Sequence, residues 1–153
     1  MKEQFTILLV EDDENDLLLI QRAFKKHFVE SSLFTTRNGH EAIEYLSGHD
    51  GFKDRLKHPF PDVVITDLKM PKMSGFELLA WIEDHQEFRV IPTIVMSASS
   101  EERDVARAYD LGANTYMVKP SDFDTLAEMV KLIRDYWAMS IKPNVKVKPK
   151  LAL

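Results

Sequence analysis

The sequence predicts an α/β fold in which a parallel sheet carries helices on both faces. Five short apolar segments lie along the chain, at residues 5–10, 33–36, 62–66, 93–97 and 114–118. Three of them, FTILLV, DVVIT and TIVMS, are nearly continuous in Val, Ile and Leu, which is typical of strands buried on both faces. The stretches between them have helical spacing. This alternation of strand and helix indicates parallel strands joined by helical crossovers.

Apolar spacing and helix-start signals support the predicted helices. Two apolar sets repeat at helical spacing: Leu17, Ile20, Phe24 and Phe28, and Leu126, Val130, Ile133 and Trp137. The segments SGFE from Ser74 and SSEE from Ser99 both fit the S-x-x-E capping box, which predicts a helix start at each. Gly112 lies where the second of these helices is expected to end.

The length and the connections define one domain. The chain has 153 residues, close to the ~150 residues of a typical domain, and we expect residues 1–140 to form it. Right-handed crossovers in so short a domain favour the flavodoxin-like strand order 2-1-3-4-5. Residues 49–61, rich in charge with one Gly and two Pro, predict a long surface loop before the third strand. Residues 141–153 contain four Lys and no acid and predict a mobile, Lys-rich C-terminal tail.

Composition excludes several classes of function. The 44% apolar and 29% charged residues are typical of a soluble globular protein. The absence of Cys excludes disulfides, zinc–thiolate sites and thiol catalysis. A net charge of −5 argues against nucleic acid or a membrane surface as partner. No apolar run reaches the ~18 residues of a membrane span, and no cleavage signal follows Met1, so we expect a cytoplasmic protein.

Polar residues lie at the carboxyl ends of the first, third, fourth and fifth predicted strands. These residues are Glu11-Asp12-Asp13, Asp67, Ser97 and Lys119, in chain order. Ligands of open parallel sheets bind beyond the carboxyl ends of the strands, so we expect these groups to converge. Several carboxylates at one edge repel one another, and a hard cation relieves the repulsion. Mg²⁺ fits, because it accepts one or two carboxylates, a carbonyl and several waters.

A phosphoryl group is the ligand that such an edge would suit. The cation and the Lys119 ammonium group would share the charge of its oxygens, and the Ser97 hydroxyl could donate one more hydrogen bond. The set contains no thiol, base or activated serine, so a carboxylate is the natural nucleophile. Asp67 is the best candidate, because it is central and is separate in sequence from the acidic cluster.

Four segments together resemble the receiver domain of two-component response regulators: LLVEDDEND, VVITDLKMPKMSGFELL, TIVMSAS and GANTYMVKP. The resemblance extends from about Phe5 to Trp137, nearly the whole chain. It implies a magnesium site in which Asp12 binds directly, Glu11 binds through water and the Lys69 carbonyl completes the protein ligands. Asp67, the implied phosphoacceptor, belongs to the same metal-binding set.

The resemblance also implies a conformational switch. Ser97 would be its hydroxyl residue and Tyr116 its aromatic residue, and Tyr116 would turn inward once a phosphoryl group draws Ser97 toward it. Lys119 would contact the phosphoryl group, and the Lys119–Pro120 peptide bond would be cis. The chain departs from the family pattern after Pro120, where many receivers have an aromatic residue directly and this sequence has Ser121-Asp122-Phe123.

The long segment before the third strand and the helix end IRDYW are similar to the single-domain regulators that partner bacterial phytochromes. The implied phosphoryl donor is a sensor histidine kinase, with a phytochrome as the candidate. On the last helix, a second apolar set lies beside the stripe that should cover the sheet: Leu132, Tyr136 and Met139. This surplus apolar surface predicts a partner surface and a homodimer through the last helix, with a broad stripe covered by the tail as the alternative.

The predicted function is that of a stand-alone response regulator that catalyses only its own phosphorylation and dephosphorylation. Lys69 and Ser99, two residues past Asp67 and Ser97, are expected to flank a hydrolytic water and to tune the phosphate lifetime. The alternative is a magnesium-dependent aspartyl-phosphate phosphatase, which needs an acid at the position that Lys69 holds. An FMN carrier would need a Ser/Thr/Gly-rich phosphate loop where the chain has Glu11-Asp12-Asp13.

Overall fold

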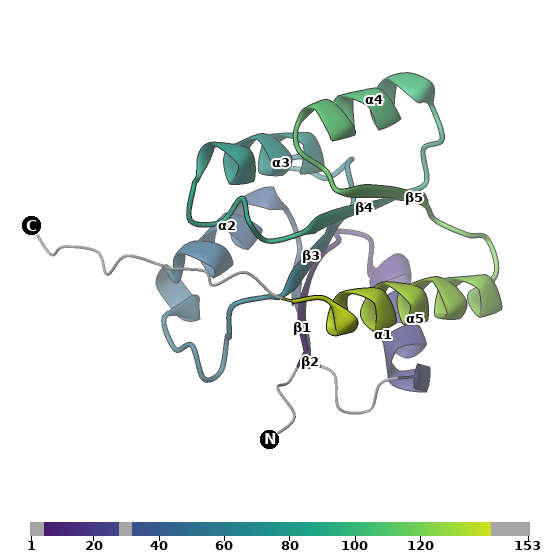
Figure 1. The fold of residues 1–153 in the computed structure, drawn as a ribbon, viewed down its shortest axis with the longest axis horizontal. Coiled ribbons are helices and arrows are strands. Elements are labelled where there is room, and N and C mark those ends of the chain that lie inside the picture. The colour runs from purple at the N-terminus through teal and green to yellow at the C-terminus, as the bar shows by residue number, and fades with distance from the viewer. Residues whose placement is uncertain (1–4, 28–31, 142–153) are drawn as a thin grey trace, which may run out of the picture.

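The computed structural model describes residues 5–27 and 32–141 and contains one five-stranded sheet (Figure 1). Its strands are β1 (Thr6–Val10), β2 (Ser32–Thr36), β3 (Val63–Thr66), β4 (Thr93–Ser97) and β5 (Thr115–Val118). Its helices are α1 (Glu14–His27), α2 (Gly39–Ser47), the short 3₁₀ helix η1 (Asp50–Phe52), α3 (Gly75–Asp84), α4 (Glu102–Asp110) and α5 (Phe123–Met139). All strands pair in parallel in the order β2-β1-β3-β4-β5, which confirms the predicted fold.

The core has two sides because successive side chains of each strand point to opposite faces of the sheet. Ile7 and Leu9 of β1 pack with the buried residues of α1 and α5. Leu8 and Val10 pack on the other face with those of α2 and α3 (Figure 1). Every residue of β1, β3 and β4 is buried, as the apolar segments predict, whereas the edge strand β5 is only partly buried.

One of the two predicted capping boxes is confirmed and the other is wrong. Ser74 caps α3, since its hydroxyl accepts the N–H of Glu77 at 3.2 Å. Helix α4 begins later than predicted, at Glu102 after an N-cap Glu101 without a side-chain cap. The Ser99 hydroxyl accepts the N–H of Glu101, two residues on rather than three, and so forms a turn before the helix. Beyond the end of α4, Gly112 has a φ of 105° and ends the helix as predicted.

The predicted surface loop at residues 49–61 contains η1 and is anchored to α2. The Arg55 guanidinium group donates to the carbonyls of Tyr45 and Leu46, both at 2.8 Å, and lies 4.0 Å over the Phe60 ring. The Tyr45 hydroxyl in turn donates to the carbonyl of Pro59 at 2.8 Å. The charged segment thus satisfies carbonyls at the end of α2.

Two sequence predictions concern residues that the structure does not describe. The predicted Lys-rich tail falls outside them apart from Ile141, and so does Phe28 of the first apolar set. Within residues 5–27 and 32–141, no helix is long and apolar enough to cross a membrane.

Gly75 brings the start of α3 directly against the chain after β3. A Cβ atom at this position would lie 1.9 Å from the carbonyl oxygen of Asp67 and 2.8 Å from the Cα of Leu68. The Gly75 N–H also donates to the Leu68 carbonyl at 2.8 Å, which fixes the approach. The Asp67 backbone is therefore held between the sheet and α3.

We predict that Gly75→Ala lowers the free energy of unfolding by about 1–3 kcal/mol, because the added methyl group collides with backbone rather than with a flexible side chain. Urea or thermal unfolding measures the change. Gly51→Ala is the control, since a Cβ there meets no atom within 4 Å. Equal stability of the two variants would contradict this account of the α3 start.

Candidate functional site

The acidic residues after β1 and β3 are positioned by the backbone of the sheet. The N–H of Glu11 donates to the carbonyl of Thr36 at 3.0 Å, and the N–H of Asp67 donates to that of Val10 at 3.1 Å. Both residues therefore extend the hydrogen bonding between neighbouring strands by one residue beyond the strand ends. Glu11 is buried, and Asp12 and Asp67 are partly buried. The sheet thus brings three carboxylates to one edge, as predicted.

Lys119 joins these acids to the end of the sheet. Its Nζ donates to Oε1 of Glu11 at 2.5 Å, to Oδ2 of Asp16 at 2.8 Å and to Oδ2 of Asp67 at 2.8 Å. Its backbone N–H donates to the carbonyl of Ser97 at 2.8 Å. One ammonium group therefore connects the residue after β1, a residue of α1 and the residue after β3, at the point where β5 ends.

Burial and charge act on the titrating groups of this site. Burial, reinforced by the nearby Asp67 carboxylate, raises the pKa of Glu11 to about 7, although the Lys119 hydrogen bond opposes the rise. Burial disfavours the ammonium form of Lys119, but its bonds to Asp16, Asp67 and Glu11 outweigh that effect and raise the Lys119 pKa above its usual value. The lysine therefore carries its positive charge throughout the physiological range.

The acidic cluster fits a divalent cation. Glu11, Asp12 and Asp67 each offer a carboxylate oxygen, and these three atoms all lie within 4.8 Å of one another. Oxygen ligands at such spacing suit a hard cation such as Mg²⁺ or Mn²⁺. Burial and the neighbouring Asp67 carboxylate both raise the pKa of Glu11, and a bound cation would oppose both effects by stabilising the charged carboxylate. The role of the Lys69 carbonyl as a further ligand stays a prediction.

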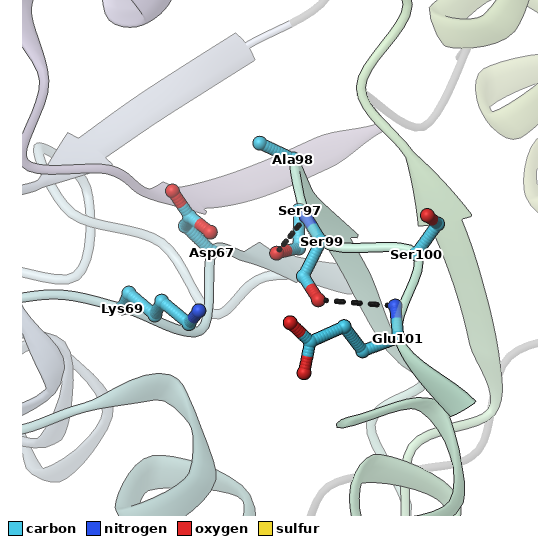
Figure 2. A pocket seen from close by; sticks show the side chains of 7 residues that line it. All are labelled: Asp67, Lys69, Ser97, Ala98, Ser99, Ser100 and Glu101. Atoms are coloured by element: carbon cyan, nitrogen blue, oxygen red, sulfur yellow. Dashed lines mark hydrogen bonds between the residues drawn. The ribbon is translucent and has the colours of Figure 1, made fainter. Parts of the chain in front are cut away.

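A pocket of about 420 Å³ opens beside Asp67 (Figure 2). Its lining residues come from the loops after β3 and β4 and are Asp67, Lys69, Ser97, Ala98, Ser99, Ser100 and Glu101. The Ser97 hydroxyl accepts the N–H of Ser99 at 3.2 Å and points toward Asp67 (Figure 2). The pocket therefore has Asp67 and Lys69 on one side and the serine hydroxyl groups together with the Glu101 carboxylate on the other (Figure 2).

Tyr116, the predicted aromatic switch residue, is directed at the loop after β4. Its hydroxyl donates to the carbonyl of Ser99 at 2.8 Å, and its ring packs against a buried cluster that includes Leu68 and Val95. Its backbone N–H donates to the hydroxyl of Tyr109 on α4 at 3.1 Å. Tyr116 is therefore linked to the pocket lining through one residue, Ser99.

Three site details differ from the sequence predictions. The described residues contain no cis peptide bond, so the cis Lys119–Pro120 bond implied by the resemblance is wrong. The trans form is intrinsically favoured before proline by about 0.5–1 kcal/mol. Asp16, a ligand of the Lys119 ammonium group, was missed, and its only sequence signal is its place in the first turn after the acidic cluster. Asp13 is outside the cluster, and its carboxylate caps α1 by accepting the N–H of Asp16 at 2.9 Å.

The second apolar set of the last helix is exposed, as predicted. Leu132 is 62% exposed, Tyr136 66% and Met139 88%. The other stripe of α5, which includes Val130 and Ile133, is buried against the sheet. The helix therefore has two separate apolar faces, and only one of them is used within the described chain.

Comparisons with known proteins point to one family. The model of the response regulator receiver domain matches residues 7–131. The chain is 36% identical over 136 residues to the probable methanogenesis regulatory protein FilR2 of Methanothrix harundinacea. The aligned region covers 89% of this chain and 85% of FilR2. The chain is also 32% identical over 135 residues to the response regulator Rcp1 of Synechocystis. That aligned region covers 88% of this chain and 90% of Rcp1.

Solved structures agree with the sequence comparisons. The phosphorylated cyanobacterial phytochrome response regulator RcpA superposes with a TM-score of 0.84 at 34% identity and covers 93% of this chain and 100% of its own. The Mn²⁺-bound form of Rcp1 gives a TM-score of 0.79 at 31% identity and covers 92% of this chain and 99% of its own. A divalent cation thus binds a relative of the same fold. The chain belongs to the response regulator receiver domain family, and its function is that of a phosphorelay response regulator.

Proposed function

We propose that Asp67 is the residue that accepts the phosphoryl group, and that a sensor histidine kinase donates it. The observation that carries this proposal is the bond between the Lys119 ammonium group and Oδ2 of Asp67 at 2.8 Å. Asp67 also lines the pocket of about 420 Å³ at this edge of the sheet and belongs to the acidic cluster. An acid with a cation on one side and an open pocket on the other is suited to phosphoryl transfer.

In the proposed reaction, a carboxylate oxygen of Asp67 bonds to phosphorus while the bond from phosphorus to the donor nitrogen breaks. Lys119 is positioned to stabilise the charge on the transferred oxygens, because its Nζ already binds the attacking carboxylate. Glu11, Asp12 and Asp67 would hold a magnesium ion, with the Lys69 carbonyl as a further ligand. When bound, this ion supplies positive charge that neutralises the phosphoryl oxygens.

We further propose that Ser97, Ser99 and Tyr116 pass the change at Asp67 to the rest of the molecule. The Ser97 hydroxyl points into the pocket, and its partner Ser99 also binds the Tyr116 hydroxyl. A movement of Ser97 toward a phosphoryl group would pull on the Ser99 N–H and thereby change the acceptor of Tyr116. The surface around β5 and α5 is where partners would sense the change.

The partner proposals rest on the relatives and on charge. Similarity to RcpA, a phytochrome response regulator, supports a phytochrome-type histidine kinase as the donor. The net charge of −5 favours protein partners over nucleic acid or a membrane surface. With this role we propose a cytoplasmic location. The exposed face of Leu132, Tyr136 and Met139 supports a homodimer through α5.

A phosphatase is not favoured over this function. An aspartyl-phosphate phosphatase needs an acid two residues beyond the nucleophile to protonate the leaving group. Lys69 holds that position, and its side chain lines the pocket where an acid would be required. We therefore propose that the chain catalyses only its own phosphorylation and dephosphorylation.

We predict that Asp67→Asn abolishes phosphorylation by acetyl phosphate in the presence of magnesium, because an amide oxygen is a far weaker nucleophile than a carboxylate. Intact mass spectrometry should show one added phosphoryl group on the wild type and none on the variant. Asp13→Asn is the control, since Asp13 lies at the same edge but outside the cluster. Equal labelling of Asp67→Asn and the wild type would refute the assignment.

We predict that magnesium affinity rises with pH up to about 7 and then levels off, because a proton on Glu11 must leave before the carboxylate can bind the ion. Below that pH the dissociation constant should increase by up to ~10-fold per pH unit. Isothermal titration across this range measures it. Glu11→Gln should flatten the profile, and an unchanged pH dependence in that variant would show that another group titrates.

We predict that Tyr136→Glu converts a dimer into a monomer, because it places a charge in the exposed apolar face of α5. Dimer affinity should fall by roughly tenfold or more, as at the centre of other protein interfaces. Light scattering of the wild type and the variant measures the change. Leu56→Glu is the matched control, because Leu56 is 96% exposed but lies in the 49–61 segment. A monomeric wild type, with and without beryllofluoride, would rule out the dimer.

A further inference from the structure

Ser99, the second residue after β4, uses all of its polar groups to connect three elements. Its N–H donates to Oγ of Ser97 at 3.2 Å, and its carbonyl accepts the Tyr116 hydroxyl at 2.8 Å. Its own hydroxyl accepts the N–H of Glu101 at 3.2 Å and donates to Oδ2 of Asp104 at 2.6 Å. Ser99 therefore joins the end of β4, strand β5 and the first turn of α4.

Asp104 is distinctive because it is an acid buried in the first turn of α4. It is 9% exposed, and among the described residues Glu11 is the other buried acid. A hydrogen bond to an ionised acceptor is shorter and stronger than one between neutral groups. Removing the donor from a buried acceptor is also costly, so the Asp104 carboxylate strongly favours the side-chain rotamer of Ser99 in which this bond forms.

The direction of the Ser99 hydroxyl matters because Ser99 lines the pocket beside Asp67. Figure 2 shows the hydroxyl pointing toward the N–H of Glu101, whereas the Ser97 hydroxyl points toward Asp67. Without Asp104, the Ser99 oxygen still accepts the N–H of Glu101, but the hydroxyl proton has lost its acceptor and can turn toward the pocket. There the hydroxyl could bind a water molecule and orient it.

We propose that Asp104 is a positioning residue that binds the Ser99 hydroxyl proton, keeps this hydroxyl from orienting a water in the pocket, and so lengthens the lifetime of the acyl phosphate on Asp67. This inference rests on the proposed role of Asp67. When the phosphoryl group is lost, a water oxygen bonds to phosphorus and the bond from phosphorus to the Asp67 oxygen breaks. The Asp67 carboxylate is regenerated, and both protons of the water leave with the inorganic phosphate. A water oriented by Ser99 speeds this step.

The test measures how fast the phosphoryl group is lost after removal of acetyl phosphate, by intact mass at fixed magnesium concentration. We expect Asp104→Ala to lose it roughly threefold or more faster than the wild type, since a positioned water reacts faster. In a Ser99→Ala background the same substitution should change the rate by less than ~1.5-fold, because the hydroxyl on which it acts is gone. Asp104→Asn keeps an acceptor for Ser99 and should return the rate toward that of the wild type.

Glu102→Ala is the matched control, because it removes an exposed acid from the same turn of α4, and it should decay like the wild type. Asp104→Leu keeps the branched shape of the side chain but cannot accept a hydrogen bond, and it gives the same comparison if the alanine variant does not fold. Faster decay in both backgrounds would indicate a loosened α4 and would overturn the proposal. Equal rates of phosphoryl loss from Asp104→Ala and from the wild type would also overturn the proposal. A wild type that takes up no phosphoryl group would refute the proposed function itself.

Discussion

Three carboxylates from three parts of the chain bind one ammonium group, that of Lys119, at the carboxyl edge of the sheet. Glu11 follows β1, Asp16 lies in α1 and Asp67 follows β3. Acids brought together at a partly buried site repel one another, and the ammonium group offsets much of that repulsion. Because the Lys119 backbone is bonded to the carbonyl of Ser97, the same charge balance also fixes the end of β5 against β4.

Under the proposed function, this balance would let chemistry on one side chain alter a distant surface. A phosphoryl group on Asp67 adds negative charge and strong acceptors where Lys119 now binds a carboxylate. In the proposed switch, the bonds between Ser97 and Ser99 and between Ser99 and Tyr116 would extend the change to β5, the strand that leads into α5. The other stripe of α5 is buried against the sheet, so a change of partner on the exposed face would require no change in the core.

The fold and most of the site can be predicted from the sequence, because a parallel sheet brings the residues after its strands to one edge. Asp67 and Lys119 are found in this way. Asp16 is not found in this way. It lies in a helix, and the spacing of residues in the sequence does not show that its side chain is directed at Lys119. The start of α4 is misplaced for a related reason. Ser99 matches a capping pattern, but its hydroxyl is used by a turn and by Asp104, which lies five residues further along the chain.

The central claim is that Asp67 lies between a cation site and the Lys119 ammonium group as an acceptor of phosphorus. A crystal structure of the protein with magnesium and beryllofluoride tests it most directly, because beryllofluoride imitates a phosphoryl group on a carboxylate. The account predicts beryllium bonded to an Asp67 oxygen. It also predicts that Lys119 Nζ and the Ser97 hydroxyl donate hydrogen bonds to the fluorine atoms, and that magnesium is bound by Asp12 and Asp67. Beryllofluoride bound at another residue, or bound nowhere while magnesium is present, would contradict it.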